Sequence, residues 1–249
     1  MSKLMNKMVK EGHLGGYIPG GDPGTWCPHL WRWAIDTFEV RSMLDVGCGE
    51  GHSARFFQQQ GCDVLGIEGS AQALANTAIP GKIAGHDFSK GTFDVPKPFD
   101  LVWSCEFLEH VESRYEDNIL ATFAHATKAI LVTHAFPWQT DGHHHVNCRP
   151  SRHWIRRIEA IGFTCDVDLT LQARTVTLQD YQGINHFARS GLVFVRSSPR
   201  SPGVLQGMRD WSSAQFKSWR IHWRFRWSGP YLQQKRRRKQ MKRDALSAH

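Results

Sequence analysis

A loop rich in glycine is the first place where this chain could bind a ligand. The segment LDVGCGEG, residues 44–51, holds Gly47, Gly49 and Gly51 between an apolar run and a stretch with helical spacing. Glycine lets the backbone turn sharply and approach a ligand closely, and a helix start presents free N–H groups. The order GxGxG, preceded by Asp45, differs from the GxGxxG of dinucleotide sites. The loop therefore indicates a ligand without a pyrophosphate, although a tight strand-to-helix turn alone has a similar pattern.

Two further segments carry groups that suit an adenosine. Glu68 ends the apolar run 64–67 and follows Gly51 by 17 residues, where the next parallel strand would deliver a carboxylate to the same sheet edge. A carboxylate there can accept both ribose hydroxyls. Asp87, beside Phe88, offers an acceptor for an exocyclic amine and an aromatic neighbour. Together these residues predict an adenosine pocket, and for each acid the alternative is a helix cap or a surface carboxylate.

The elements that must position these groups alternate between strands and helices. Short apolar runs predict strands, and the polar stretches between them have helical spacing. This alternation predicts a mainly parallel sheet covered on both faces. The expected strands are 43–46, 64–67, 99–103 and 130–133, and the expected helices are 28–39, 52–60, 70–77, 113–127 and 151–161. The later runs 163–171 and 187–195 are expected to pair as an antiparallel edge.

Four motifs give the chain a family resemblance over roughly residues 28–196. They are LDVGCGEG (44–51), GIE (66–68), HDF (86–88) and FDLVWSCEFLEHV (99–111), and in this order they resemble the class I S-adenosylmethionine-dependent methyltransferases. The resemblance implies S-adenosylmethionine as cofactor. It also implies an α/β, Rossmann-like, doubly wound sheet of seven mostly parallel strands with an antiparallel edge strand. The cofactor-binding residues that it suggests are Asp45, Gly47, Cys48, Gly49, Glu68, Gly69, Asp87, Phe88 and Ser104.

Histidines are the natural candidates for the chemistry that such a transfer needs. The methyl carbon is already activated, so the protein must position the acceptor, exclude water and remove a proton from an O–H or N–H nucleophile. His110 follows the predicted strand 99–103, and His144 and His145 lie in the loop after the predicted strand 130–133, where open α/β sheets bind ligands. A polar surface loop is the alternative for these histidines. We expect no metal here, because consecutive histidines rarely aim at one ion.

The residues after the predicted strand 99–103 limit the acceptor. Methyltransferases of DNA base amines carry a proline-containing box at this place, where this chain has Ser104, Cys105, Glu106 and Phe107. Cys105 also lacks the preceding proline that usually accompanies the nucleophilic cysteine of cytosine C5 methyltransferases. The acceptor is therefore expected to be a hydroxyl, amine or carboxylate of a small molecule, sugar or lipid. An aminopropyl transferase, which also uses an adenosine cofactor, is an alternative to a methyltransferase.

The positive charge of the chain belongs to its C-terminal part. Residues 196–249 carry a formal charge of +12, whereas residues 1–195 carry −4. Trp211, Trp219, Trp223 and Trp227 recur at multiples of four among arginines. Within residues 211–243 this pattern fits contact with an anionic membrane or with nucleic acid, or a helix that packs its Trp face on the core. The alternative functions are therefore an RNA methyltransferase or a nucleic-acid- or membrane-binding protein.

The remaining expectations concern domain organisation and cellular compartment. The chain has 249 residues, no apolar run of membrane-spanning length, no apolar leader and six scattered cysteines, so a cytoplasmic protein with reduced thiols is expected. The predicted parts are a Gly-rich lead and lid (1–27), the methyltransferase domain (28–196), a linker (197–203) and a basic, aromatic, helical extension (204–249).

Overall fold

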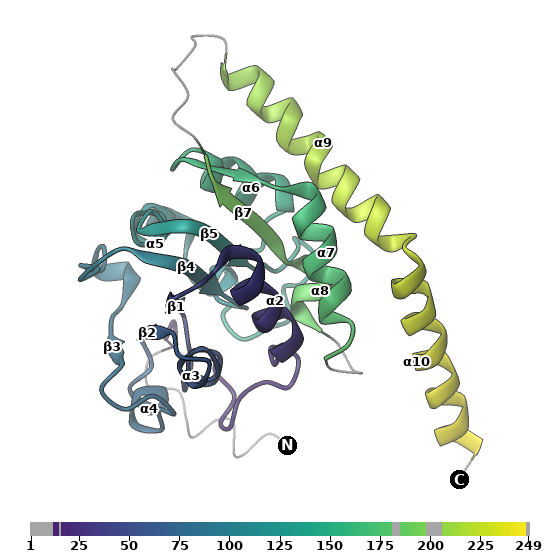
Figure 1. Ribbon diagram of the computed structural model, residues 1–249, viewed down its shortest axis with the longest axis horizontal. Coiled ribbons are helices and arrows are strands. Elements are labelled where there is room, and N and C mark those ends of the chain that lie inside the picture. Colours follow the sequence, from purple (N-terminus) through teal and green to yellow (C-terminus); the bar gives the residue numbers. More distant parts are fainter. Residues whose placement is uncertain (1–11, 15, 181–184, 198–205, 248–249) are drawn as a thin grey trace.

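A seven-stranded sheet forms the centre of the molecule (Figure 1). The computed structural model describes residues 12–14, 16–180, 185–197 and 206–247. The strand order is β3-β2-β1-β4-β5-β7-β6. The strands are β1 (Ser42–Val46), β2 (Asp63–Glu68), β3 (Ile83–Gly85), β4 (Phe99–Ser104), β5 (Ala126–Val132), β6 (Phe163–Cys165) and β7 (Leu192–Arg196).

The strand directions confirm the predicted sheet. β1 pairs in parallel with β2 and β4, β2 with β3, and β4 with β5. β7 runs antiparallel to both β5 and β6. The strand order reverses between β1 and β4, and open α/β sheets bind ligands at the carboxyl ends of the strands beside such a switch point.

Alternating side chains on the strands build one apolar core on each face of the sheet. On β1, Met43 belongs to one core, while Leu44 and Val46 belong to the other. Helices α2 (Pro28–Phe38) and α3 (His52–Gln59) cover the first face with Trp31 and Phe57. The helices on the second face are α5 (Glu116–Phe123) and α6 (Ser151–Glu159). Burial on both faces explains why the strands are nearly continuous apolar runs.

Two predicted strands are only partly formed. The run 163–171 forms β6 over its first three residues and then continues as α7 (Val167–Thr177). Asp166 begins this helix, because its carboxylate accepts hydrogen bonds from the backbone of Asp168 and Leu169. Residues 187–190 of the other run belong to α8 (His186–Ser190), which Asn185 caps. The strand prediction was wrong there because capping residues override the apolar pattern.

The smaller elements connect the sheet to the loops at its carboxyl edge. Ser70 caps α4 (Ala71–Ala75) through a hydrogen bond from the backbone of Ala73. The 3₁₀ turns are η1 (Phe88–Lys90), η2 (Leu108–His110) and η3 (Ser113–Tyr115). Two of them, η1 and η2, directly follow the ends of β3 and β4, so they bring predicted site residues to that edge.

The C-terminal extension consists of two helices, α9 (Gln206–Arg226) and α10 (Gly229–Ser247). Figure 1 shows α9 alongside α6 and α7. Ala214, Ile221 and Phe225 are buried on its inner side. The predicted linker lies outside the described residues except for Ser197, as do the first eleven residues of the predicted lead and residue 15.

The Trp face of α9 points away from the domain. Phe216, Trp219, Trp223 and Trp227 are 53–62% exposed, while the side chain of Trp211 lies outside the described part of the chain. The alternative in which this face packs on the core is therefore wrong. Among the described residues, none of the helices combines the length and apolar character that a membrane crossing requires.

Candidate active site

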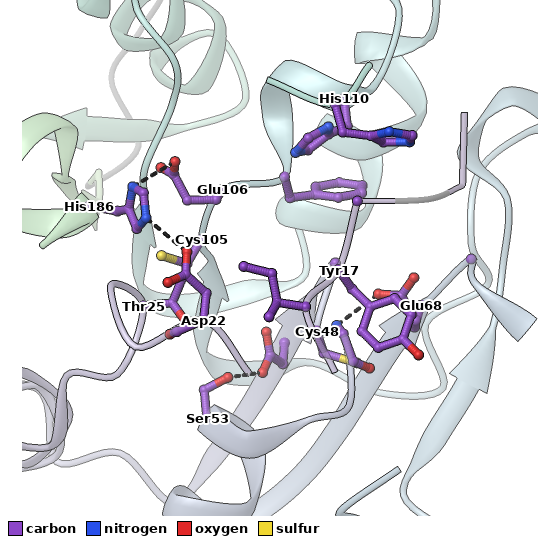
Figure 2. A pocket seen from close by; sticks show the side chains of 18 of the residues that line it. Tyr17, Asp22, Thr25, Cys48, Ser53, Glu68, Cys105, Glu106, His110 and His186 are labelled. Carbon is purple, nitrogen blue, oxygen red and sulfur yellow. Dashed lines mark hydrogen bonds and ion pairs between the residues drawn. The ribbon is translucent and has the colours of Figure 1, made fainter. Parts of the chain in front are cut away.

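A cavity of about 820 Å³ lies at the carboxyl edge of the sheet (Figure 2). This volume falls within the range of about 300–1,000 Å³ that is usual for small-molecule pockets. The cavity is lined by the N-terminal segment, the glycine loop, the ends of β2 and β3, the turn after β4, the loop after β5 and two residues of α8. It therefore lies where the strand order predicts a ligand.

The glycine loop forms one wall, and its backbone requires glycine. Gly47, Gly49 and Gly51 have φ angles of 74°, 56° and 82°, in the left-handed region that side chains disfavour. A Cβ at Gly47 would lie 2.3 Å from ring atoms of Phe107. The loop thus presents bare backbone to the cavity and packs against the turn that follows β4.

Glu68 connects the end of β2 to this loop. Its carboxylate accepts hydrogen bonds from the backbone N–H groups of Gly49 and Ser70, each 2.8 Å long. Burial raises the pKa of Glu68, and these hydrogen bonds oppose the rise. Because a carboxylate has about four lone-pair sites, the side chain keeps acceptor capacity for a ligand. Figure 2 shows Tyr17 beside it on the cavity side.

Asp87 and Phe88 lie at the same end of the cavity. The Asp87 carboxylate accepts a hydrogen bond from the Ser89 backbone at 2.9 Å, and its other oxygen lies 3.0 Å from His13 Nε2. Burial works in the opposite direction, but these two partners hold the pKa of Asp87 at about 2. The ring of Phe88 meets that of Phe107 edge-on at 5.7 Å. An ionised acceptor beside aromatic rings suits a purine amine.

Eight of the nine predicted cofactor residues line the cavity, and Ser104 does not. Burial raises the pKa of Asp45 to about 7, against a hydrogen bond from Ser53. Burial also raises the pKa of the Cys48 thiol, which lies under the loop. Ser104 is fully buried and donates a hydrogen bond to the carbonyl of Val46 at 2.8 Å, so it joins β4 to β1.

Described residues of the N-terminal segment line the cavity, and its action as a lid stays a prediction. Residues 13–26 contribute many of the lining side chains. A Cβ at Gly69 would lie 2.6 Å from Leu14 Cδ2, so the segment rests directly on the end of β2. The Gly20 backbone N–H also donates to Glu50 Oε2 at 3.1 Å.

The opposite end of the cavity holds a charged group that sequence reasoning missed. His186 lies between two carboxylates, with Nδ1 2.8 Å from Glu106 Oε2 and Nε2 3.0 Å from Asp22 Oδ2 (Figure 2). Burial opposes protonation, but both acids together raise the pKa of His186 to about 9. Arg189 Nη2 lies 3.6 Å from the same Glu106 oxygen. His186 directly precedes the run 187–195 that was predicted as a strand, so nothing in its local pattern indicated this place.

The backbone of Glu106 is also unusual. Its φ of 52° lies in the left-handed region, which is rare for a residue with a side chain and often marks a functional site. Thr133 at the end of β5 holds it there, because its hydroxyl lies 2.6 Å from the Glu106 backbone N–H and 2.9 Å from Oε1.

The structure brings two of the three candidate histidines together, His110 and His145, whereas His144 lies near His13, with ring centroids 6.5 Å apart. His110, His144 and His145 all line the cavity, and the rings of His110 and His145 meet edge-on with centroids 5.1 Å apart. Burial, followed by the neighbouring charge of His145, lowers the pKa of His110 to about 4. Burial also lowers the pKa of His144. The His110 side chain is therefore neutral at physiological pH.

Comparisons with known proteins support the predicted family. Residues 44–130 match a family model described as a methyltransferase domain. A malonyl-[acyl-carrier protein] O-methyltransferase of Enterobacter lignolyticus (strain SCF1) is 38% identical over 65 residues. That match covers 25% of this chain, and it spans about a quarter of the length of the relative (26%).

One solved structure shares the fold at low identity, and a second matches with a lower TM-score. The sugar N-methyltransferase KedS8 from Streptoalloteichus sp. ATCC 53650 is 15% identical, with a TM-score of 0.54 over 74% of this chain and 94% of its own. Magnesium protoporphyrin IX methyltransferase from Synechocystis PCC 6803 with bound SAH is 14% identical over 68% and 80% of the two chains, with a TM-score of 0.49. At 15% identity, the likeness to KedS8 establishes the fold alone.

Proposed function

Residues 44–130 carry a methyltransferase domain within a class I S-adenosylmethionine-dependent methyltransferase fold, and from this premise we propose that the protein methylates a hydroxyl, amine or carboxylate of a small molecule, sugar or lipid. One observation carries the proposal. A single cavity joins the glycine loop, Glu68 and Asp87 at one end to a cluster of polar side chains at the other. One end suits an adenosine, and the other suits a polar acceptor.

The residues present fit S-adenosylmethionine, which supplies an electrophilic methyl group on a sulfonium. Glu68 and Asp87 face the cavity with free acceptor sites, in the places expected for ribose hydroxyls and the adenine amine. Phe88 offers an aromatic neighbour for the purine. The bare backbone of Gly47 and Gly49 leaves room for the methionine part, beside Asp45. The lid residues Leu14 and Tyr17 exclude water from this end.

The acceptor belongs at the other end of the cavity. Glu106, His186 and Asp22 form a preorganised row of charges that can orient a polar molecule. His110 and His145 line the adjoining wall, where the acceptor's nucleophile would approach the methyl carbon. Bound S-adenosylmethionine would supply the methyl carbon to the acceptor atom, and its sulfur would leave with the electrons of the carbon–sulfur bond. An O–H or N–H acceptor also loses a proton, and this polar wall is where it leaves.

A labelled-methyl transfer assay tests the proposed activity. The full chain is incubated with S-adenosylmethionine carrying a labelled methyl group and with separate fractions of sugars, lipids, other small molecules, RNA and protein. We expect label in a small-molecule, sugar or lipid fraction, with the label lost in Glu68→Gln. Transfer to RNA alone would overturn the acceptor class. Use of the aminopropyl donor in place of the methyl donor would overturn the reaction.

A separate observation favours a second role for the extension: we propose that α9 and α10 bind the surface of an anionic bilayer. The aromatic rings of Phe216, Trp219 and Trp223 stack in a row along α9, with centroids 6.2 Å and 5.8 Å apart. Exposed cationic side chains continue along α10: Lys235, Arg236, Arg237, Lys239, Lys242 and Arg243. Aromatic and basic residues on a helix surface are typical of interfacial membrane binding.

The stacking favours lipid over nucleic acid. Bases bind to open aromatic faces, whereas each of these rings already faces a neighbour on the same helix. A ridge of ring edges can instead enter the headgroup region. Binding of single-stranded RNA is the competing outcome in the experiment that follows.

Vesicle sedimentation tests the membrane proposal. We expect the full chain to sediment with phosphatidylglycerol-containing vesicles but not with pure phosphatidylcholine, and the double substitution Trp219→Ala/Trp223→Ala to lower binding at least about tenfold. Trp138→Ala is the matched control, because Trp138 is 75% exposed outside the extension. Binding to RNA but not to anionic vesicles, or equal losses in both variants, would refute the proposal.

A further inference from the structure

Glu109 has a buried carboxyl group whose oxygens lack hydrogen-bond partners in the described part of the chain. The residue lies in η2 and is fully buried. An unpartnered buried carboxylate is costly, because it loses its hydration without gaining a compensating contact. The proposed methyl transfer assigns no role to Glu109.

Two imidazoles offer free nitrogens to the same point. Ligand atoms of Glu109, His110 and His145 all lie within 4.8 Å of one another. His110 Nδ1 has no partner within the described part of the chain. His145 Nδ1 lies 2.5 Å from the carbonyl oxygen of Gln139. That bond fixes Nδ1 as the protonated nitrogen, so Nε2 keeps a lone pair, as in histidines that bind metals.

The backbone holds the three side chains together although they come from two segments. The N–H groups of Val146 and Asn147 both donate to the carbonyl of Glu109, each at 3.0 Å. These bonds attach the loop after β5 to η2. A Cβ at Gly142 would lie 2.2 Å from the His145 ring, so the loop also packs closely on that imidazole. The donor set is thus fixed by local structure.

The charge around the cluster favours a cation. The nearby cations His186 and Arg189 are already engaged by Glu106, and His186 by Asp22 as well. Neither cation is therefore left to pair with Glu109, whose oxygens lack a hydrogen-bond partner among the described residues. A divalent ion would bind one of these oxygens.

We propose that Glu109, His110 and His145 bind one divalent transition-metal ion at the acceptor end of the cavity. Two imidazole nitrogens and one carboxylate oxygen suit Zn²⁺ and similar ions better than Mg²⁺ or Ca²⁺. The proposed site differs from the expectation of no metal: its ligands are one member of the His143–His145 triplet and the adjacent pair that ends η2. Consecutive histidines are not needed.

The site also suggests how the acceptor is held, and this step rests on the proposed methyl transfer. Three protein ligands leave room for a further ligand from the cavity, which His110 and His145 both line. An acceptor oxygen bound there loses its proton more easily, as metal-bound water does. His110 and His145 then act as metal ligands and do not take the proton themselves.

Titration of the metal-free full chain with Zn²⁺, without cofactor, tests the site. We expect wild type to bind one Zn²⁺ more per chain than Glu109→Gln, or to bind it at least about tenfold more tightly, and His145→Asn to behave like Glu109→Gln. His143→Asn is the matched control, since it removes a histidine of the same loop outside the cluster. It should bind as wild type does.

A second measurement covers the case in which a variant does not fold. Co²⁺ bound to wild type should give the visible absorption of nitrogen-ligated cobalt, and His110→Asn should lose it. Equal Zn²⁺ binding in wild type and the cluster variants, or no binding, would overturn the metal site. Titration with S-adenosylhomocysteine separates the two proposals, because loss of metal binding with intact nucleoside binding refutes the metal site alone.

Discussion

The two ends of the cavity are built in different ways. The end proposed for the cofactor uses backbone and single acids that follow consecutive strands: the glycine loop after β1, Glu68 at the end of β2 and Asp87 after β3. The acceptor end gathers side chains from distant segments, such as Asp22, Glu106 and His186. A binding surface of backbone serves one constant ligand, while a surface of side chains can change with the acceptor. Substitutions at one end should therefore leave the other end unaffected.

The largest effect is expected at the acceptor end. Glu106→Gln removes the charge that holds His186 and Arg189, and should lower methyl transfer by on the order of 100-fold or more. Affinity for S-adenosylhomocysteine should stay within about twofold. Steady-state kinetics and calorimetric titration measure the two quantities. A parallel loss of nucleoside affinity would show that the ends are not independent.

The next largest effect, on the free energy of unfolding, separates the cost of a left-handed backbone at Gly47 from the cost of crowding against Phe107. Gly47→Ala should destabilise the protein by about 3 kcal/mol, because a left-handed residue costs about 1–2 kcal/mol and crowding against Phe107 adds about as much. Gly81→Ala is the matched control, with φ of 73° against 74° and no atom within 4 Å of its Cβ. Urea unfolding should show a loss of only about 1–2 kcal/mol for it. Equal losses would contradict the role of Phe107.

The pH dependence of stability should depend on the acceptor end. The pKa of His186 is raised to about 9 in the folded protein, so its contribution is complete below the ordinary histidine value of about 6.5 and is lost as pH rises through 9. Urea unfolding of wild type should therefore lose on the order of 2 kcal/mol more than His186→Gln between pH 6.5 and 9.5. Parallel curves would mean that the two carboxylates do not hold a proton on His186.

The smallest effect, on nucleoside affinity, is expected from His13 in the predicted lid. His13 is exposed, and such ion pairs contribute about 0–1 kcal/mol. His13→Ala should therefore weaken S-adenosylhomocysteine binding by less than about fivefold, measured by titration, since Asp87 keeps its bond from Ser89. A much larger loss would make the lid part of the cofactor site.

The same contrast explains what sequence could predict. Gly47, Glu68 and Asp87 follow strands whose order is fixed by β/α alternation, so their meeting at one edge follows from topology. Ser104 follows the same logic, but its side chain points into the sheet and bonds Val46. His186 and Glu109 could not be predicted, because their roles depend on contacts between distant loops. The face of α9 that packs on the domain also depends on tertiary contacts, and neither its periodicity nor its charge indicated it.

Calorimetric titration of the full chain with S-adenosylhomocysteine tests whether the cavity binds the nucleoside through Glu68. Two variants at opposite ends of β2 are compared with wild type. Glu68→Gln alters the carboxylate in the cavity, whereas Asp63→Asn alters an exposed carboxylate paired with Lys82 and Lys97. We predict one site per wild-type chain, an affinity at least about tenfold weaker in Glu68→Gln, and no change in Asp63→Asn. Absence of binding by wild type, or equal affinity in Glu68→Gln, would contradict the account.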